Sequence, residues 1–176
     1  MSSDTLTRIP AGTYNIDPAH SNVGFEVKHL GIATVRGSFT KFEGTIVDGV
    51  LNGTVEVASV NTGQEPRDAH LQAPEMFDSA QFPVIKFHST EVEASGDDVT
   101  LVGDITIKGV TKPFTLKGEL AEVAEDPQGN ARIGFEVAGK IDRTDFGVSF
   151  NQVLPNGDKA IADKVKIIVS VSAVKA

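Results

Sequence analysis

Apolar and polar residues alternate along most of the chain, and this period of two predicts β-strands. In residues 22–29, Val23, Phe25 and Val27 fall on one face, while Glu26 and Lys28 fall on the other. The last strand should be long, because valine and isoleucine alternate with lysine and serine from 161 to 174. The same pattern predicts further strands over residues 34–39, 42–47, 54–60, 83–89, 100–107, 113–120 and 132–141.

Turn residues separate these segments and indicate antiparallel hairpins. The clearest hairpin joins 100–107 to 113–120 through the loop 108–111, and the other predicted turns are Asp48-Gly49, Asn52-Gly53, 126–130 and Asn156-Gly157. About eight antiparallel strands in one domain are enough to close a barrel. Gly37 and Gly44 interrupt strand patterns, which favours a strongly bent barrel wall over an open sheet.

Residues 61–77 break the alternation and form the one convincing helical interval. Thr62 and Glu65 have the spacing of a capping box, although Pro66 fits the first helical position equally well. Pro74 should end or interrupt the helix, which leaves Met76 and Phe77 beyond the break. These two side chains could gate an opening or pack the helix onto the barrel, and packing is the preferred interpretation.

The composition narrows the classes of partner. A formal charge of −8 argues against binding to nucleic acid and against adhesion to anionic lipid surfaces, although it leaves room for a local basic site. No stretch is long and apolar enough to cross a membrane, and residues 1–10 lack a secretory core, so a cytoplasmic protein without stable membrane insertion is expected. Residues 1–12 are predicted to be an N-terminal extension to a single domain over 13–176.

The residues with catalytic potential do not assemble into a recognisable site. There is no cysteine, and the four histidines are too scattered for a metal site, so neither a metal nor another cofactor is expected. His20 and Ser21 are neighbours on an extended chain and would point in opposite directions. No phosphate-binding loop or nucleophile elbow is present, and the protein is therefore predicted not to be an enzyme.

Several motifs, taken in order, resemble the YceI-like family. They begin with Tyr14-Asn-Ile-Asp-Pro-Ala-His-Ser21 and end with Asp142-Arg-Thr-Asp-Phe-Gly147, with Gly37-Ser-Phe39, 59–63, 67–71 and 103–111 between them. The resemblance spans nearly the whole chain. It implies an all-β fold: a single closed, elongated, lipocalin-like antiparallel β-barrel of about eight strands, with one helix packed across it. It further implies a long-chain isoprenoid held in an apolar tunnel.

The resemblance implies that the apolar strand faces are candidate lipid contacts. The predicted lining residues are Phe25, Val27, Phe39, Val55, Phe87, Ile105, Phe114, Phe135 and Val169. Four polar residues, Arg67, Asp68, Arg143 and Asp145, are expected either to hold a head group or, as the preferred interpretation, to form structural ion pairs. The main alternative is a stress-related protein-interaction module whose barrel is filled by its own side chains. Strand edges that the helix leaves uncovered weakly favour a homodimer.

Overall fold

A computed structural model describes residues 9–121 and 123–176. Most of the predicted N-terminal extension lies outside these residues, but Ile9 is buried in the hydrophobic core. The strands are β1 Thr13–Ile16, β2 Asn22–His29, β3 Ala33–Phe39, β4 Phe42–Val47, β5 Val50–Glu56, β6 Val60–Asn61, β7 Val84–Ser95, β8 Asp98–Ile107, β9 Val110–Leu120, β10 Ala124–Glu125, β11 Ala131–Asp142 and β12 Ile161–Lys175. The helices are α2 Glu65–Leu71 and the short 3-10 segments η1 Pro18–His20, η2 Val57–Ser59 and η3 Arg143–Phe146.

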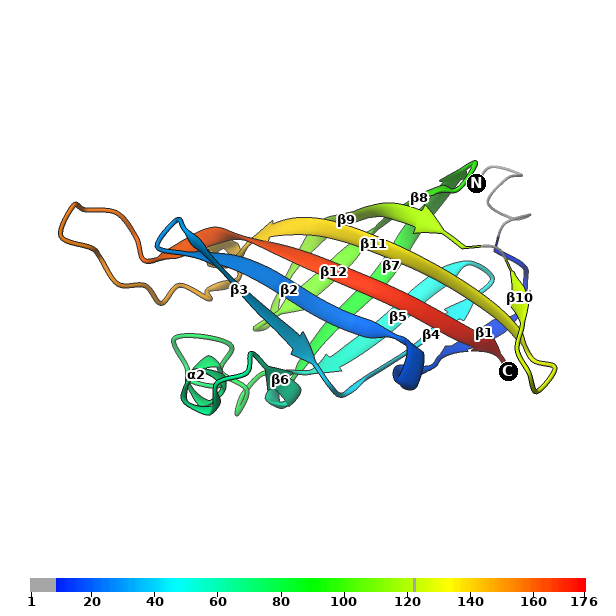
Figure 1. Cartoon of the computed structure of the whole chain (residues 1–176), viewed down its shortest axis with the longest axis horizontal. Helices are drawn as coiled ribbons and strands as arrows, with labels where there is room; N and C mark the ends of the chain where they lie inside the picture. Colours follow the sequence, from blue (N-terminus) through cyan, green and yellow to red (C-terminus); the bar gives the residue numbers. More distant parts are fainter. Residues whose placement is uncertain (1–8, 122) are drawn as a thin grey trace.

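The strands form an elongated barrel that closes between β11 and β12 (Figure 1). Around the closed ring the order is β12, β11, β9, β8, β7, β5, β4 and β1, and every pairing is antiparallel. The predicted closed antiparallel barrel of eight strands is therefore confirmed. The α-helix α2 lies against one end of this barrel, as the prediction of a single packed helix required.

Three stretches of the wall are bent strands rather than single straight ones. β2 and β1 lie one after the other along the same edge of β12, so the chain from 13 to 29 acts as one strand interrupted by η1. β3 and β4 also lie one after the other, with β3 beside β2 and β4 beside β1. β5 is followed by η2 and the short β6, which pairs with β3. The wall therefore has a line of bends across it, which separates β2, β3 and β6 from the rest.

Asp17 fixes the first of these bends. Its carboxylate accepts a hydrogen bond from the Ala19 amide and caps η1, in which Pro18 occupies the first turn. The same carboxylate lies 3.0 Å from Arg132 Nη1 and 2.8 Å from His20 Nδ1, and Arg132 also contacts Asp126 at 2.9 Å. The opening motif of the chain is thus explained by a strand bend that β11 holds in place.

The ion pairs at this bend make stability depend on pH. Hydrogen bonds from His20 and Arg132 lower the pKa of Asp17 to about 2, below its ordinary value of 3.8. The stabilisation is present above the unfolded pKa and is lost as the pH falls through the folded one. We expect the free energy of unfolding to fall between about pH 4 and pH 2. Asp17→Asn should weaken this dependence in urea titrations, and an identical pH profile in both proteins would contradict the assignment.

Apolar residues of alternate strand positions face the inside of the barrel and form one core. Two tight hairpins keep this alternation in register. Asp48 and Gly49 have φ of 47° and 85°, and Lys108 and Gly109 have φ of 52° and 76°, as two-residue turns with positive φ require. Lys108-Gly109 is shorter than the predicted loop, because Val110 and Thr111 already pair within β9.

Two local predictions were wrong. Asn52-Gly53 is not a turn but lies inside β5, where Gly53 pairs with Gly44, because the hairpin is already closed at Asp48-Gly49. The strand predicted over 54–60 accordingly starts earlier, at Val50, and ends at Glu56.

Of the two helix starts that the sequence left open, the structure has the one with proline in the first turn and not the capping box. Helix α2 starts at Glu65 with Pro66 in its first turn and no side-chain cap at Gln64, while the Thr62 hydroxyl bonds to Asp68 instead. The helix ends at Leu71, before Pro74, as the proline predicted. Within the described residues, no helix is long and apolar enough to cross a bilayer.

Candidate functional site

An apolar cavity runs along the inside of the barrel. Its volume, counted as the space open to the centre of a water molecule, is about 200 Å³. β12 lines it from Val165 to Val171, which is about 20 Å at the rise of an extended strand. The lining also includes Val23 and Phe25 of β2, and Ile105 and Ile107 of β8. Such a narrow apolar space excludes water and favours a hydrocarbon chain.

Phenyl rings lie over glycines on three parts of the inner wall. A Cβ built at Gly37 would come 2.3 Å from Phe25 Cζ, and one at Gly103 would come 2.8 Å from Phe87 Cζ. Phe114 covers Gly139 in the same way. The glycines let bulky rings lie close to the backbone, so the centre of the barrel stays open although its wall is aromatic.

Replacing Gly37 by alanine should narrow the cavity, because the added methyl group displaces the Phe25 ring from the wall. We expect affinity for a long apolar ligand to fall by about threefold to tenfold in a fluorescence displacement titration. Gly53→Ala is the matched control, since Gly53 also lines the cavity but its added Cβ would meet only Glu43 O at 3.8 Å. Equal affinities in the two variants would rule out this role for Gly37.

Helix α2 and the turns after it cover the cavity on one side. Leu71, Met76 and Phe77 of this segment line the cavity, and the Phe77 ring meets Phe39 edge-on at 6.2 Å. Met76 and Phe77, which follow Pro74 in the chain, are therefore part of the cavity lining. Met76 is buried in the hydrophobic core and Phe77 packs against that core, so both side chains help to pack this segment onto the barrel.

Two contacts fix this cover to the barrel. The Lys108 ammonium donates to the carbonyl groups of Pro74 and Gly147. The His70 ring lies edge-on to Phe150, with 4.6 Å between ring centres. The cover is thus joined to the base of the loop that connects η3 to β12.

Arg143 brings a charged group to the cavity wall. It is 5% exposed, and burial lowers the pKa of its guanidinium. Four of its five N–H groups have acceptors among the described residues, and all four acceptors are backbone carbonyls, those of Val148, Phe150, Ile161 and Ala162. These contacts hold the two ends of the loop 147–160 against the barrel.

Most of the predicted lining residues lie on the cavity wall. Eight of the nine line the cavity, namely Phe25, Val27, Phe39, Val55, Phe87, Ile105, Phe114 and Val169. Phe135 faces inward and is 6% exposed, but it packs in the core without lining the cavity. Alternation alone also pointed to Ile141, Val165 and Ile167, whereas Phe146 and Val148 lie where no strand pattern could have indicated them.

The four polar residues do not form one cluster. Arg67 donates to the Thr62 hydroxyl and carbonyl, and Asp68 accepts from the Thr62 amide, so both belong to the start of α2. Asp145 is exposed on η3, whereas the Arg143 guanidinium is buried and bonds to backbone carbonyls. The two Arg–Asp pairs suggested by the sequence are thus replaced by contacts through a threonine and through backbone carbonyls.

His20 and Ser21 take separate partners, although His20 ends the 3-10 segment η1 and does not lie on the extended strand that the prediction assumed. His20 pairs with Asp17, and the Ser21 hydroxyl bonds to the backbone of Ser172. Among residues 9–121 and 123–176, no group of three or more acidic, histidine or cysteine side chains is placed to hold a metal ion.

A family model for the YceI-like domain matches residues 14–173. The chain belongs to the YceI-like family. Protein YceI of Escherichia coli O17:K52:H18 is 35% identical over 174 residues, which cover 94% of this chain and 88% of that protein. The resemblance first seen in the ordered motifs is thereby confirmed.

Solved structures of YceI-like proteins have the same barrel. The YceI protein of Campylobacter jejuni matches with a TM-score of 0.72 and 31% identity, over 91% of this chain and 96% of the other. A domain from Saccharophagus degradans, described as polyisoprenoid-binding, matches with a TM-score of 0.72 over 93% of this chain and 98% of its own. At 16% identity, that likeness supports the shared fold alone.

Proposed function

We propose that this YceI-like protein binds a long-chain isoprenoid lipid of the quinone or polyprenyl type, and carries or sequesters it without chemical change. The observation that carries the proposal is the narrow apolar cavity along the barrel axis. Its lining offers branched aliphatic and phenyl groups to a hydrocarbon tail. Each methylene group buried there should contribute about 0.8 kcal/mol to binding.

The lining includes two charged residues, Arg143 and Glu43, and the cation favours one orientation of the ligand. Arg143 lies at the base of the loop 147–160, while the wall between Val165 and Val171 is apolar on its inner face. We place the tail along this apolar wall and the polar head group toward the Arg143 end. The positive charge would favour an electron-rich oxygen there, even though backbone carbonyls occupy most of the guanidinium donors.

A barrel filled by its own side chains remains the alternative, as part of a protein-interaction module. Such a barrel would leave no continuous cavity between β12 and the opposite wall. The glycines beneath Phe25, Phe87 and Phe114 favour the lipid-binding proposal, because larger residues at those positions would fill the centre.

A displacement titration tests the proposal. An apolar fluorescent dye bound by the protein should be displaced by a polyprenol and by an isoprenoid quinone, with one ligand bound for each chain. Shorter isoprenoids should bind more weakly, because they bury fewer carbon atoms. Ligand recovered after incubation should be unchanged by mass spectrometry. Absence of saturable displacement would overturn the proposed binding, and a chemically altered ligand would overturn the non-catalytic part.

A further inference from the structure

One end of the barrel exposes large apolar side chains. We call this end the barrel tip and define it as the β2–β3 turn, residues 28–34, with the adjoining loop residues 150–160. It includes Leu30 at 44% exposure, Ile32 at 82% and Val153 at 76%. Isolated exposed apolar residues are common on soluble proteins, but several on one protruding feature indicate a surface that meets another apolar phase.

Hydrogen bonds connect the two parts of the barrel tip. The Leu30 amide donates to the Ala160 carbonyl at 2.7 Å, and the Ala160 amide donates to the Gln152 carbonyl at 2.8 Å. Val153 then pairs with Lys159 across the loop. Figure 1 shows the turn and the loop together at the end of the barrel opposite the C-terminus. Ile32 and Val153 are thus carried on one connected structure.

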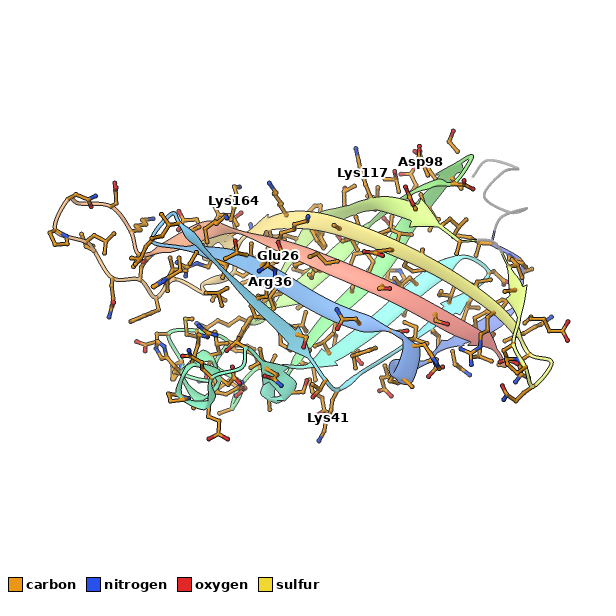
Figure 2. All side chains as sticks on the ribbon, viewed as in Figure 1. Glu26, Arg36, Lys41, Asp98, Lys117 and Lys164 are labelled. Atoms are coloured by element: carbon orange, nitrogen blue, oxygen red, sulfur yellow. The ribbon has the colours of Figure 1, made fainter. Side chains whose placement is uncertain are left out.

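The charge of the barrel tip differs from that of the whole chain. Its charged residues are Lys28, Asp158 and Lys159, so two cations and one anion give it a charge of +1, against −8 for the chain. Asp163 pairs with Lys159 at 3.2 Å, and Lys164, which Figure 2 labels near the same end, pairs with Asp142 at 3.9 Å. With these three neighbours the charge of this end is zero, so the acidic excess that argues against anionic surfaces lies elsewhere on the molecule.

The cavity reaches the same end. Val27 lines it and directly precedes the turn, while Val148 and Ile161 line it close to the two ends of the loop. A surface that contacted the barrel tip would therefore lie beside the cavity rather than at the far side of the barrel.

From these observations we propose that the barrel tip docks on the surface of a phospholipid bilayer. Ile32 and Val153 enter the boundary between head groups and acyl chains, with Leu30 beside them, and Lys28 and Lys159 contact lipid phosphates. Peripheral proteins bind bilayers through this combination of apolar and cationic side chains. The docking itself does not depend on the ligand, whereas exchange of lipid between bilayer and cavity rests on the proposed function.

Sedimentation with vesicles of phosphatidylethanolamine and phosphatidylglycerol tests the docking. The double variant Ile32→Ser, Val153→Ser should partition at least about tenfold more weakly than the unmodified protein. Val123→Ser is the matched control, because Val123 is 47% exposed beside β10 at the other end of the barrel, and it should sediment normally. Failure of the unmodified protein to sediment, or equal sedimentation of the double variant, would overturn the proposal.

A second measurement separates docking from lipid binding. Isoprenoid supplied in detergent micelles should load the double variant as well as the unmodified protein, while loading from vesicles should be about tenfold slower. If the double variant loaded equally poorly from micelles and from vesicles, the substitutions would have damaged the cavity, and this result would overturn the docking explanation. If no route loads the unmodified protein, the proposed function fails, and vesicle sedimentation still decides the docking.

Discussion

Val169→Asp is expected to abolish retention of a long-chain lipid. Val169 lines the middle of the cavity on β12, between Val23 and Val137 of the neighbouring strands. An aspartate there would place an unpaired charge in an apolar space, which disfavours a hydrocarbon ligand and holds water instead. We expect at least about a hundredfold loss of affinity in the dye displacement titration, because moving an unpaired carboxylate from water into an apolar space costs several kcal/mol.

Ile168→Asp is the control for this substitution, because Ile168 directly precedes Val169 on β12 and does not line the cavity. It should retain the ligand. Circular dichroism and urea titration must show that both variants are folded. Should Val169→Asp fail to fold, Val169→Phe tests the same position by filling the cavity with apolar volume. Full binding by a folded Val169→Asp variant would contradict a ligand inside the barrel.

Arg143→Met is expected to lower the free energy of unfolding by about 3 kcal/mol or more. The substitution removes the donors to four backbone carbonyls at the base of the loop 147–160. Arg143→Lys should recover only part of this loss, because one ammonium group cannot reach the same set of acceptors. Urea unfolding monitored by circular dichroism measures both variants.

Arg67→Met is the control for the stability loss expected of Arg143→Met. Arg67 is half-buried and, within the part of the chain that the structure describes, its side chain bonds only to Thr62, so its loss should cost about 1 kcal/mol. If Arg143→Met lost no more than Arg67→Met, the buried guanidinium would not be holding the loop, and its place in the cavity wall would need another explanation.

Much of the barrel could be predicted from local patterns, because each strand alternates between a core face and an outer face. β2 and β4 begin and end where the alternation predicted. Asn52-Gly53 shows the limit of turn motifs. Gly49 lies in a hairpin turn, whereas Gly53 lies inside a strand opposite Gly44. Only this strand pairing, and not the local sequence, distinguishes the two glycines.

The candidate site was predicted less completely, for two physical reasons. Alternation says which face a side chain takes but not where along the barrel the cavity lies, so Phe135 was placed in the lining although it packs in the core. Contacts made by loops leave no periodic signal. The role of Arg143 depends on backbone carbonyls that only the folded loop 147–160 brings together.

Native mass spectrometry of freshly purified protein, followed by solvent extraction, tests the central claim most directly. The protein should carry one long-chain isoprenoid for each chain, and the extract should identify its tail and head group. Val169→Asp purified in parallel should carry none. Protein that is reproducibly free of any lipid, and that does not take up isoprenoid when it is supplied, would contradict a lipid-binding barrel and favour the protein-interaction module.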